Sequence, residues 1–233
     1  MSSAALPAFA TVAIAVAVGL WPRRAGDAGR RRVELALAGL GSVLLVAVKL
    51  DDGWRSGSFL SAALPIQVCD VSSIACVAAL LGGYRLASAI ALYFGLALSS
   101  LALVFPDLGG GPASLEYWLF WSRHGVILAS AIYLLAVRRF APTWRDYARW
   151  CAFAVVYVAL VTTVNDALGT NYAFIADRTP EHTRAVDAFG PWPGRAVVML
   201  ALAWLQAAAL TWLLSAWPAR RRAIVDCGRK PIR

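Results

Sequence analysis

The sequence predicts an all-α fold: a polytopic membrane protein built as a bundle of seven transmembrane helices, with the N-terminus outside and the C-terminus inside. Of its 233 residues, 60% are hydrophobic and only 15% are charged, too few polar side chains to cover a soluble globule of this size. Apolar runs of about 20 residues, the length that crosses a hydrocarbon core of about 30 Å, recur along the chain. Basic residues gather in alternate connectors between these runs.

The apolar runs give seven predicted spans, separated by connectors that contain the proline, glycine and charge clusters. The first run has no basic segment before it and a basic cluster after it, which is typical of a retained span and not of a cleaved signal peptide. The spans lie at about residues 4–21, 33–50, 60–81, 86–104, 115–137, 150–168 and 194–216. The predicted organisation is one transmembrane domain over residues 1–218 and a basic cytoplasmic tail over residues 219–233.

The orientation follows from the basic residues, because connectors rich in Lys and Arg resist translocation and stay in the cytoplasm. The first, third and fifth connectors and the tail hold sixteen Lys and Arg residues, and the other connectors hold three. The net charge of +9 is then explained by topology and by anionic lipid headgroups, so membrane lipids and no nucleic acid are the expected partners. The preference for Arg over Lys is typical of a GC-rich bacterial genome, and so of a bacterial cytoplasmic membrane.

The third predicted span carries polar residues that lipid cannot bind. Gln67, Cys69 and Asp70 stand together in "IQVCD". At 100° per residue, these three side chains share one half of the helix surface with Ser73 and Cys76. That half must face other helices or water.

Polar residues of two other spans lie at a matching depth. The third and fifth spans both run from outside to inside, and Cys69 and His124 each lie about nine residues, or roughly 13 Å, past the outer end. Arg123 adjoins His124, and Asn165 and Asp166 end the sixth span near the outer surface, where an alternative is that they only cap that helix. The sequence predicts that polar side chains of three helices converge in the outer half of the bilayer.

This group fits a nucleophile with its base. His124 could take the proton of Cys69, Arg123 could offset developing negative charge, and Asp70 or Asp166 could orient the imidazole. Simpler alternatives remain open for each residue. Asp70 and Arg123 could form an ion pair that joins two helices, Cys69 could be a small packing residue, and His124 could bond to a helix backbone.

Other chemistries lack their motifs. The chain contains no HExxH, no CxxC pair, no GxxxxGK and no GxGxxG, so no metal site and no cofactor are expected. A retinal Schiff base needs a lysine in the seventh span, and the only lysines are Lys49 and Lys230. No two cysteines lie in exported connectors, so structural disulfides are not expected.

Five stretches carry a resemblance to a known family: "LPIQVCDVSSI", "YFGLALSSLALVFPDL", "SRHGVILASAIY", "NDALGTNYAFI" and "PWPG". In this order, over residues 64–194, they resemble the YwaF-like family of bacterial integral membrane proteins. That family is similar to a eukaryotic transmembrane acyltransferase that remodels ether phospholipids through a cysteine, and more distantly to membrane hydrolases that use threonine and histidine. The resemblance implies that Cys69 is an acyl-accepting nucleophile, that His124 is its base, and that Asn171 and Tyr172 shape an entrance.

Two functions are therefore compatible with the sequence. The first is a membrane-embedded lipid acyltransferase or acyl hydrolase that uses the Cys69 and His124 pair in the outer half of the bilayer. The second is a non-catalytic transporter or channel, in which Asp70, Arg123 and Asp166 join His124 in a polar pathway for protons or a small solute.

Overall fold

The computed structural model describes residues 5–106, 108–176 and 188–228, with side chains described as far as Ser215. All regular structure in these ranges is helical. The elements are α1 (Ala5–Leu20), η1 (Trp21–Arg24), α2 (Asp27–Ser56), α3 (Phe59–Ala62), α4 (Val68–Gly82), α5 (Arg85–Ile90), η2 (Ala91–Leu98), α6 (Ser99–Val104), α7 (Leu115–Ala136), α8 (Trp144–Leu168), η3 (Tyr172–Phe174) and α9 (Gly194–Gly228).

Six helical segments in the described chain are long and apolar enough to cross a membrane, so the protein is an all-α, multi-pass membrane protein. These segments coincide with six of the predicted spans. They are Ala5–Arg24, Asp27–Ser56, Arg85–Val104, Leu115–Ala136, Trp144–Leu168 and Gly194–Ser215. The backbone of α9 continues as a helix past the predicted boundary at residue 218, so the first part of the predicted tail is helical.

The predicted third span, residues 60–81, is not one continuous helix. The short helix α3 ends at Ala62, and α4 begins only at Val68 and has 15 residues. Pro65 lies in the break between them. Proline has no backbone N–H and disfavours a helical conformation in the residue before it, so the helix cannot continue through this segment although its composition is apolar.

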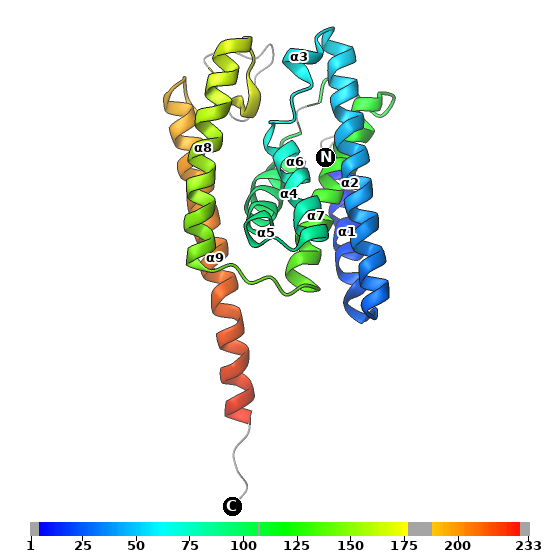
Figure 1. Cartoon of the computed structure of the whole chain (residues 1–233), viewed down its shortest axis with the longest axis vertical. Helices are drawn as coiled ribbons and strands as arrows, with labels where there is room; N and C mark the ends of the chain where they lie inside the picture. Colours follow the sequence, from blue (N-terminus) through cyan, green and yellow to red (C-terminus); the bar gives the residue numbers. More distant parts are fainter. Residues whose placement is uncertain (1–4, 107, 177–187, 229–233) are drawn as a thin grey trace, which may run out of the picture.

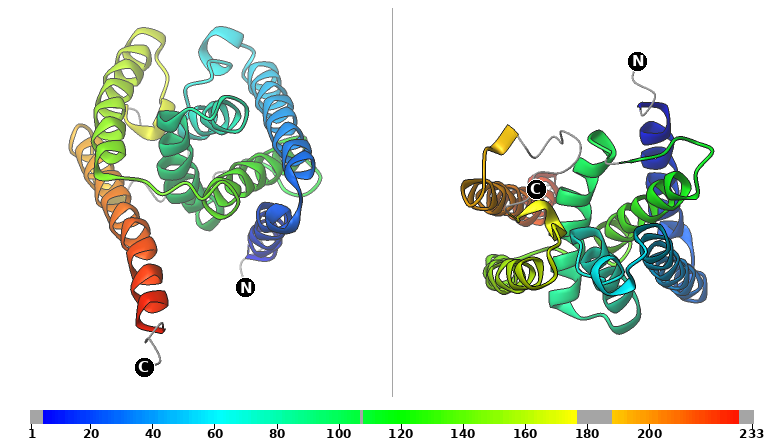
Figure 2. Two further views of the ribbon diagram at one scale, coloured as in Figure 1. Left: turned by 60° about the horizontal axis from the view of Figure 1, so that its bottom comes forward. Right: turned by 90° about the horizontal axis from the view of Figure 1, so that it is seen from above.

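The helices form three side-by-side groups in all the views (Figures 1 and 2). The central group contains α4, α5, η2, α6 and α7, with α1 and α2 on one side and α8 and α9 on the other. The central helix α7 contacts α1, α2, α4 and η2, while α9 contacts α8 and η2. Side chains on α4 and α7 can therefore reach each other, and both helices also contact α2.

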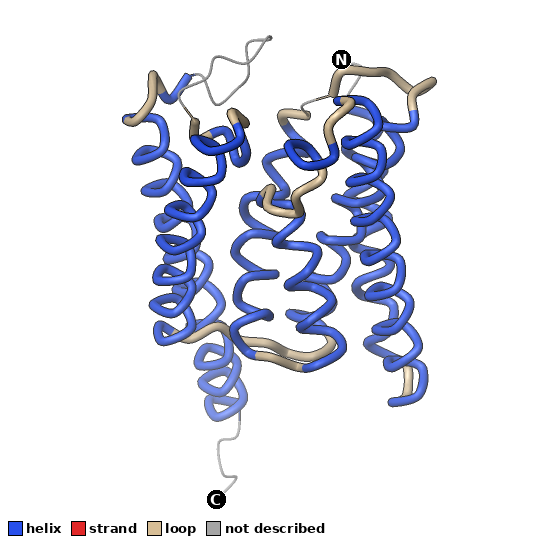
Figure 3. Tube along the Cα trace, turned by 45° about the horizontal axis from the view of Figure 1, so that its top comes forward, coloured by secondary structure: helices blue, strands red, loops and turns tan. Residues whose placement is uncertain are grey.

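The first, third and fifth connectors, which hold most of the basic residues between the predicted spans, lie at one end of the bundle. In Figure 1 the turn between α1 and α2, the turn between α4 and α5, and the connector from α7 to α8 all lie at the lower end, whereas α3, η3 and the start of α9 lie at the upper end. The alternation of long helices between the two ends can be followed along the tube in Figure 3. The first, third and fifth connectors thus share one end of the bundle.

Arg138, directly after α7, forms hydrogen bonds that connect the lower ends of α2, α4 and α7. Its guanidinium donates to the carbonyl oxygens of Ala79 (2.9 Å) and Leu80 (2.6 Å) at the end of α4, and its Nε donates to Glu34 Oε1 of α2 at 2.7 Å. The Tyr133 hydroxyl of α7 donates to the same carboxylate oxygen at 2.9 Å. The bond to Leu80 satisfies a carbonyl at the end of α4, and the Ala79 carbonyl also accepts the backbone N–H of Gly83.

The α5 to α6 span contains a π-helical stretch, η2, with Tyr93 fully buried. The Tyr93 hydroxyl and the Thr211 hydroxyl of α9 lie 2.6 Å apart. Gly95 allows close packing on α7, because a Cβ atom there would lie 3.0 Å from a methyl group of Ile127. The irregular stretch thus packs on α7 within the central group and connects that group to α9.

Candidate functional site

The start of α4 is fixed from several directions. Gln67 is the N-cap residue, in an extended conformation (φ −62°, ψ 152°), and its backbone N–H donates to Asp70 Oδ2 at 3.1 Å. The side-chain oxygen of Gln67 accepts the backbone N–H of Ala173 at 2.9 Å. The Tyr157 hydroxyl of α8 donates to the carbonyl oxygen of Ile66 at 2.7 Å. The polar residues of "IQVCD" therefore form a helix start inside the protein, and not the middle of a long span.

Asp70 is the centre of an ion-pair cluster that joins three helices. Its side chain is 0% exposed, with Arg123 Nη1 of α7 at 2.7 Å from Oδ1 and Lys49 Nζ of α2 at 3.0 Å from Oδ2. Lys49 Nζ also lies 3.0 Å from Asp52 Oδ2. Because lipid offers no partner to a carboxylate, the ion pairs with Arg123 and Lys49 are what allows Asp70 to be buried within the bundle.

Lys49 is the site residue that sequence reasoning missed. It is the one lysine in a predicted span, near the end of the apolar run over residues 33–50. The signal that could have found it is charge balance, because a buried carboxylate within reach of two cationic spans tends to pair with both. Its side chain is only 10% exposed.

Cys69 lies in the first turn of α4, immediately before Asp70, and is partly buried. Arg123, Asp70 and Lys49 all act on its thiol electrostatically, and the Tyr157 hydroxyl lies close enough to interact with it as well. In the described part of the chain, Arg123 Nε is buried and has no hydrogen-bond partner. Burial of the thiol opposes an anion at Cys69, whereas the N-terminus of α4 and the Arg123 guanidinium favour one.

His124 is 3% exposed on α7, and its Nδ1 lies 2.8 Å from the carbonyl oxygen of Phe120. A carbonyl oxygen only accepts, so Nδ1 carries the hydrogen and Nε2 of the neutral ring holds the lone pair that a base needs. The imidazole also lies against the Phe120 ring, with centroids 4.3 Å apart. Arg123 acts electrostatically on both His124 and Cys69, so it is a shared neighbour of the two side chains.

Asn165 shapes the loop that follows α8. The residue is 1% exposed. Its Oδ1 accepts hydrogen bonds from the Thr170 hydroxyl (2.9 Å) and the Tyr172 backbone N–H (2.7 Å), and its Nδ2 donates to the Tyr172 carbonyl oxygen (3.0 Å). Asn171 Oδ1 accepts the backbone N–H of Ala176 at 3.0 Å. The loop is thereby held in the conformation that brings Ala173, with its positive φ of 55°, onto Gln67.

Most of the polar residues predicted from the sequence lie in or next to one bonded cluster, and Asp166 lies outside it. Gln67, Asp70 and Arg123 lie in the bonded cluster around α4, and the loop of Asn165, Asn171 and Tyr172 reaches that cluster through Ala173. The Tyr172 hydroxyl donates to the Ser61 carbonyl oxygen at 3.2 Å. Asp166 is different, because it is exposed on the surface of α8.

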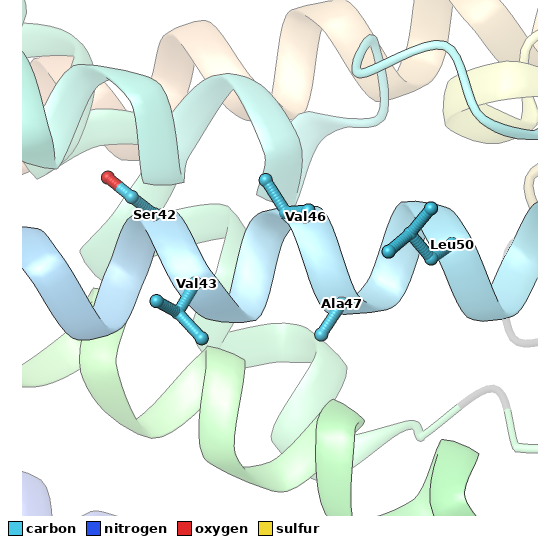
Figure 4. A pocket seen from close by; sticks show the side chains of 5 residues that line it. All are labelled: Ser42, Val43, Val46, Ala47 and Leu50. Carbon is cyan, nitrogen blue, oxygen red and sulfur yellow. The ribbon is translucent and has the colours of Figure 1, made fainter.

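Among the described residues, no group of three or more His, Cys, Asp or Glu side chains is placed to hold a metal ion. A shallow apolar depression runs along α2 instead (Figure 4). It is lined by Ser42, Val43, Val46, Ala47 and Leu50. Figure 4 shows these side chains on successive turns of one helix, between the ribbons of its neighbours, a surface that suits a hydrocarbon chain.

The comparisons with known proteins give a family assignment. No curated protein and no solved structure matches the chain. The model of the TMEM164 family matches residues 1–211. Since that match covers most of the sequence, the chain belongs to the TMEM164 family of membrane proteins.

Proposed function

We propose that the protein is a membrane-embedded lipid acyltransferase or acyl hydrolase with Cys69 as nucleophile. The observation that carries the proposal is the place of Cys69: in the first turn of α4, partly buried, with the Arg123 guanidinium acting on the thiol. Helix N-termini and arginines are the surroundings in which a cysteine becomes nucleophilic. The resemblance of the five sequence stretches to the YwaF-like family and to a cysteine-dependent acyltransferase agrees with this assignment.

In the proposed reaction, Cys69 Sγ attacks the carbonyl carbon of a lipid ester and gives its proton to Nε2 of His124. The new S–C bond forms as the ester C–O bond breaks, and His124 returns the proton to the departing alkoxide. The resulting thioester is then cleaved by an acceptor hydroxyl, which completes acyl transfer, or by water, which completes hydrolysis. Arg123 stabilises the negative charge that develops on the carbonyl oxygen.

We further propose seven membrane crossings, with the N-terminus outside and the C-terminus in the cytoplasm of a bacterial cell. The seventh crossing comes from α4 together with α3 and the segment between them. The basic connectors at the lower end in Figure 1 support this orientation. The proposed reaction then occurs in the outer half of the bilayer, where Asn171 and Tyr172 lie at the entrance and membrane lipids are the partners. A C-terminal alkaline phosphatase fusion should be inactive, and an active fusion would reverse the orientation.

The catalytic test compares lipid turnover in Cys69→Ala, His124→Ala and the double variant, at equal expression and folding. A nucleophile and its base act as a unit, so either single variant should lose nearly as much activity as the double variant. Cys151→Ala is the matched control, because Cys151 is also partly buried but lies on α8 outside the cluster. Full activity in Cys69→Ala would eliminate covalent catalysis by this residue.

A non-catalytic transporter or channel is the second candidate. The observation in its favour is a continuous series of ionisable groups, from partly exposed Asp52 through Lys49 to buried Asp70 and Arg123. Solute or proton flux that is abolished by Asp70→Asn and retained in Cys69→Ala would favour this function over acyl transfer. The opposite pattern, lipid turnover lost in Cys69→Ala without any flux in the parent protein, would exclude it.

A further inference from the structure

The buried ion-pair cluster has more positive than negative charge. Asp70 carries one negative charge on a side chain that is 0% exposed, and its two oxygens bind Arg123 and Lys49, whose side chains are each 10% exposed. Asp52, the other partner of Lys49, has a side chain that is 29% exposed and is also bound by Arg55 Nη2 at 3.1 Å. Arg55 also binds Asp51 and Glu116, so it does not neutralise Asp52 alone, but solvent screens this partly exposed carboxylate more than the buried groups. The three buried side chains, Asp70, Arg123 and Lys49, together carry one surplus positive charge.

The surplus charge lies next to Cys69. The thiol is acted on by Arg123 and Lys49, and Arg123 Nε is buried and has no partner in the part of the chain that is described. If Asp70 bound Arg123 alone, the two would form a neutral pair, and little positive charge would remain for the neighbouring thiol. Because Lys49 binds the second oxygen of Asp70, the guanidinium is not fully neutralised.

We propose that Lys49 is a positioning residue that keeps the positive charge of Arg123 available to an anion at Cys69. The anion is first the thiolate and then the oxyanion that forms on the acyl carbonyl. Lys49 itself contacts Asp70 and Asp52, so it influences Cys69 only through its charge and does not touch the reacting atoms. The purpose assigned to this charge rests on the proposed function, but its effect on the thiol can be measured without any lipid turnover.

The test measures alkylation of Cys69 by iodoacetamide in the purified full chain, at one fixed pH, with each cysteine followed by mass spectrometry. The thiolate sulfur forms a bond to the reagent carbon as iodide leaves, so the rate reports the fraction of thiolate. Lys49→Met should slow the reaction about tenfold, the factor that corresponds to about 1.4 kcal/mol of lost electrostatic stabilisation. Lys49→Arg should restore the rate, and Cys151 in the same molecules is the internal reference for reagent access.

A double variant separates charge from packing. Lys49→Met with Asp70→Asn removes one positive and one negative charge and leaves Arg123 unneutralised, so Cys69 should react at about the parent rate. A rate as slow as in Lys49→Met alone would overturn the proposal, and so would an unchanged rate in Lys49→Met. If Lys49→Met does not accumulate, the rates of the double variant and of Lys49→Arg test the proposal.

Loss of lipid turnover with normal Cys69 alkylation in all variants would count against both the inference and the electrostatic part of the mechanism. Normal charge effects without turnover in the parent would refute only the proposed function.

Discussion

Replacing Asp70 by asparagine tests how much of the bundle's stability depends on one buried carboxylate. The variant keeps the shape of the side chain but removes its negative charge. In the parent protein, Arg123 Nη1 and Lys49 Nζ lie 2.7 and 3.0 Å from the carboxylate oxygens, and both lose this charged partner. Removing one member of a buried pair costs about 3–5 kcal/mol, because the remaining charge is uncompensated. Lys49 would retain Asp52 at 3.0 Å, so the loss falls mainly on Arg123, and we expect a value within that range and not twice as large.

The assay is reversible unfolding of the full chain in mixed micelles, read as the free energy of unfolding. Asp166→Asn is the matched control, since Asp166 is an exposed carboxylate on α8, and its change should stay within about 0.5 kcal/mol. Adding Lys49→Met and Arg123→Met to Asp70→Asn should recover most of the loss, because apolar replacement of a whole buried ion cluster is often neutral. If Asp70→Asn is no more destabilising than Asp166→Asn, the ion pairs do not stabilise the bundle and the reasoning is refuted.

Three further changes have expected results in the same assay. Asn165→Ala should destabilise by about 3 kcal/mol, since three hydrogen bonds to the loop after α8 are lost, and an effect no larger than that of Asp166→Ala would contradict this role. Arg138→Met should lower stability by about 1–3 kcal/mol because it removes three hydrogen bonds, although Ala79 keeps the Gly83 N–H and Glu34 keeps the Tyr133 hydroxyl as partners, whereas exposed Arg139→Met should be close to neutral. Tyr93→Phe should cost about 1 kcal/mol, the value of one hydrogen bond to α9, and a neutral result would mean that this bond is replaced.

Hydropathy alone predicted most of the fold. Six apolar runs became helices long enough to cross a membrane, because hydrocarbon leaves backbone groups no partner except one another. The run over residues 60–81 shows the limit of this reasoning. Its mean hydropathy is that of a span, but Pro65 divides it, and a sum over a window does not register one missing N–H.

The polar cluster was predictable to the extent that charges in a bilayer must find partners. An ion pair between Asp70 and Arg123 was one of the alternatives that the sequence left open, and the structure places the two side chains 2.7 Å apart. Lys49 was not expected, since a lysine near the end of a predicted span can also extend to the lipid headgroups. Only the distance of 3.0 Å between Nζ and Asp70 Oδ2 shows that it turns inward.

The relation of Cys69 to His124 is the part that depth could not decide. Counting residues from the outer ends gives a position along a helix axis, but not the direction in which a side chain points around that axis. Adjacent residues of a helix point about 100° apart, so the pairing of Arg123 with Asp70 does not by itself direct His124 toward Cys69. Its Nδ1 bond to Phe120 then fixes the tautomer and leaves Nε2 as the basic atom. A direct proton transfer from Cys69 therefore requires Nε2 to face the start of α4, whereas stabilisation of the thiolate by Arg123 does not. The two contributions act on different steps, and for this reason His124→Ala can abolish turnover while Cys69 remains as reactive toward iodoacetamide as in the parent protein.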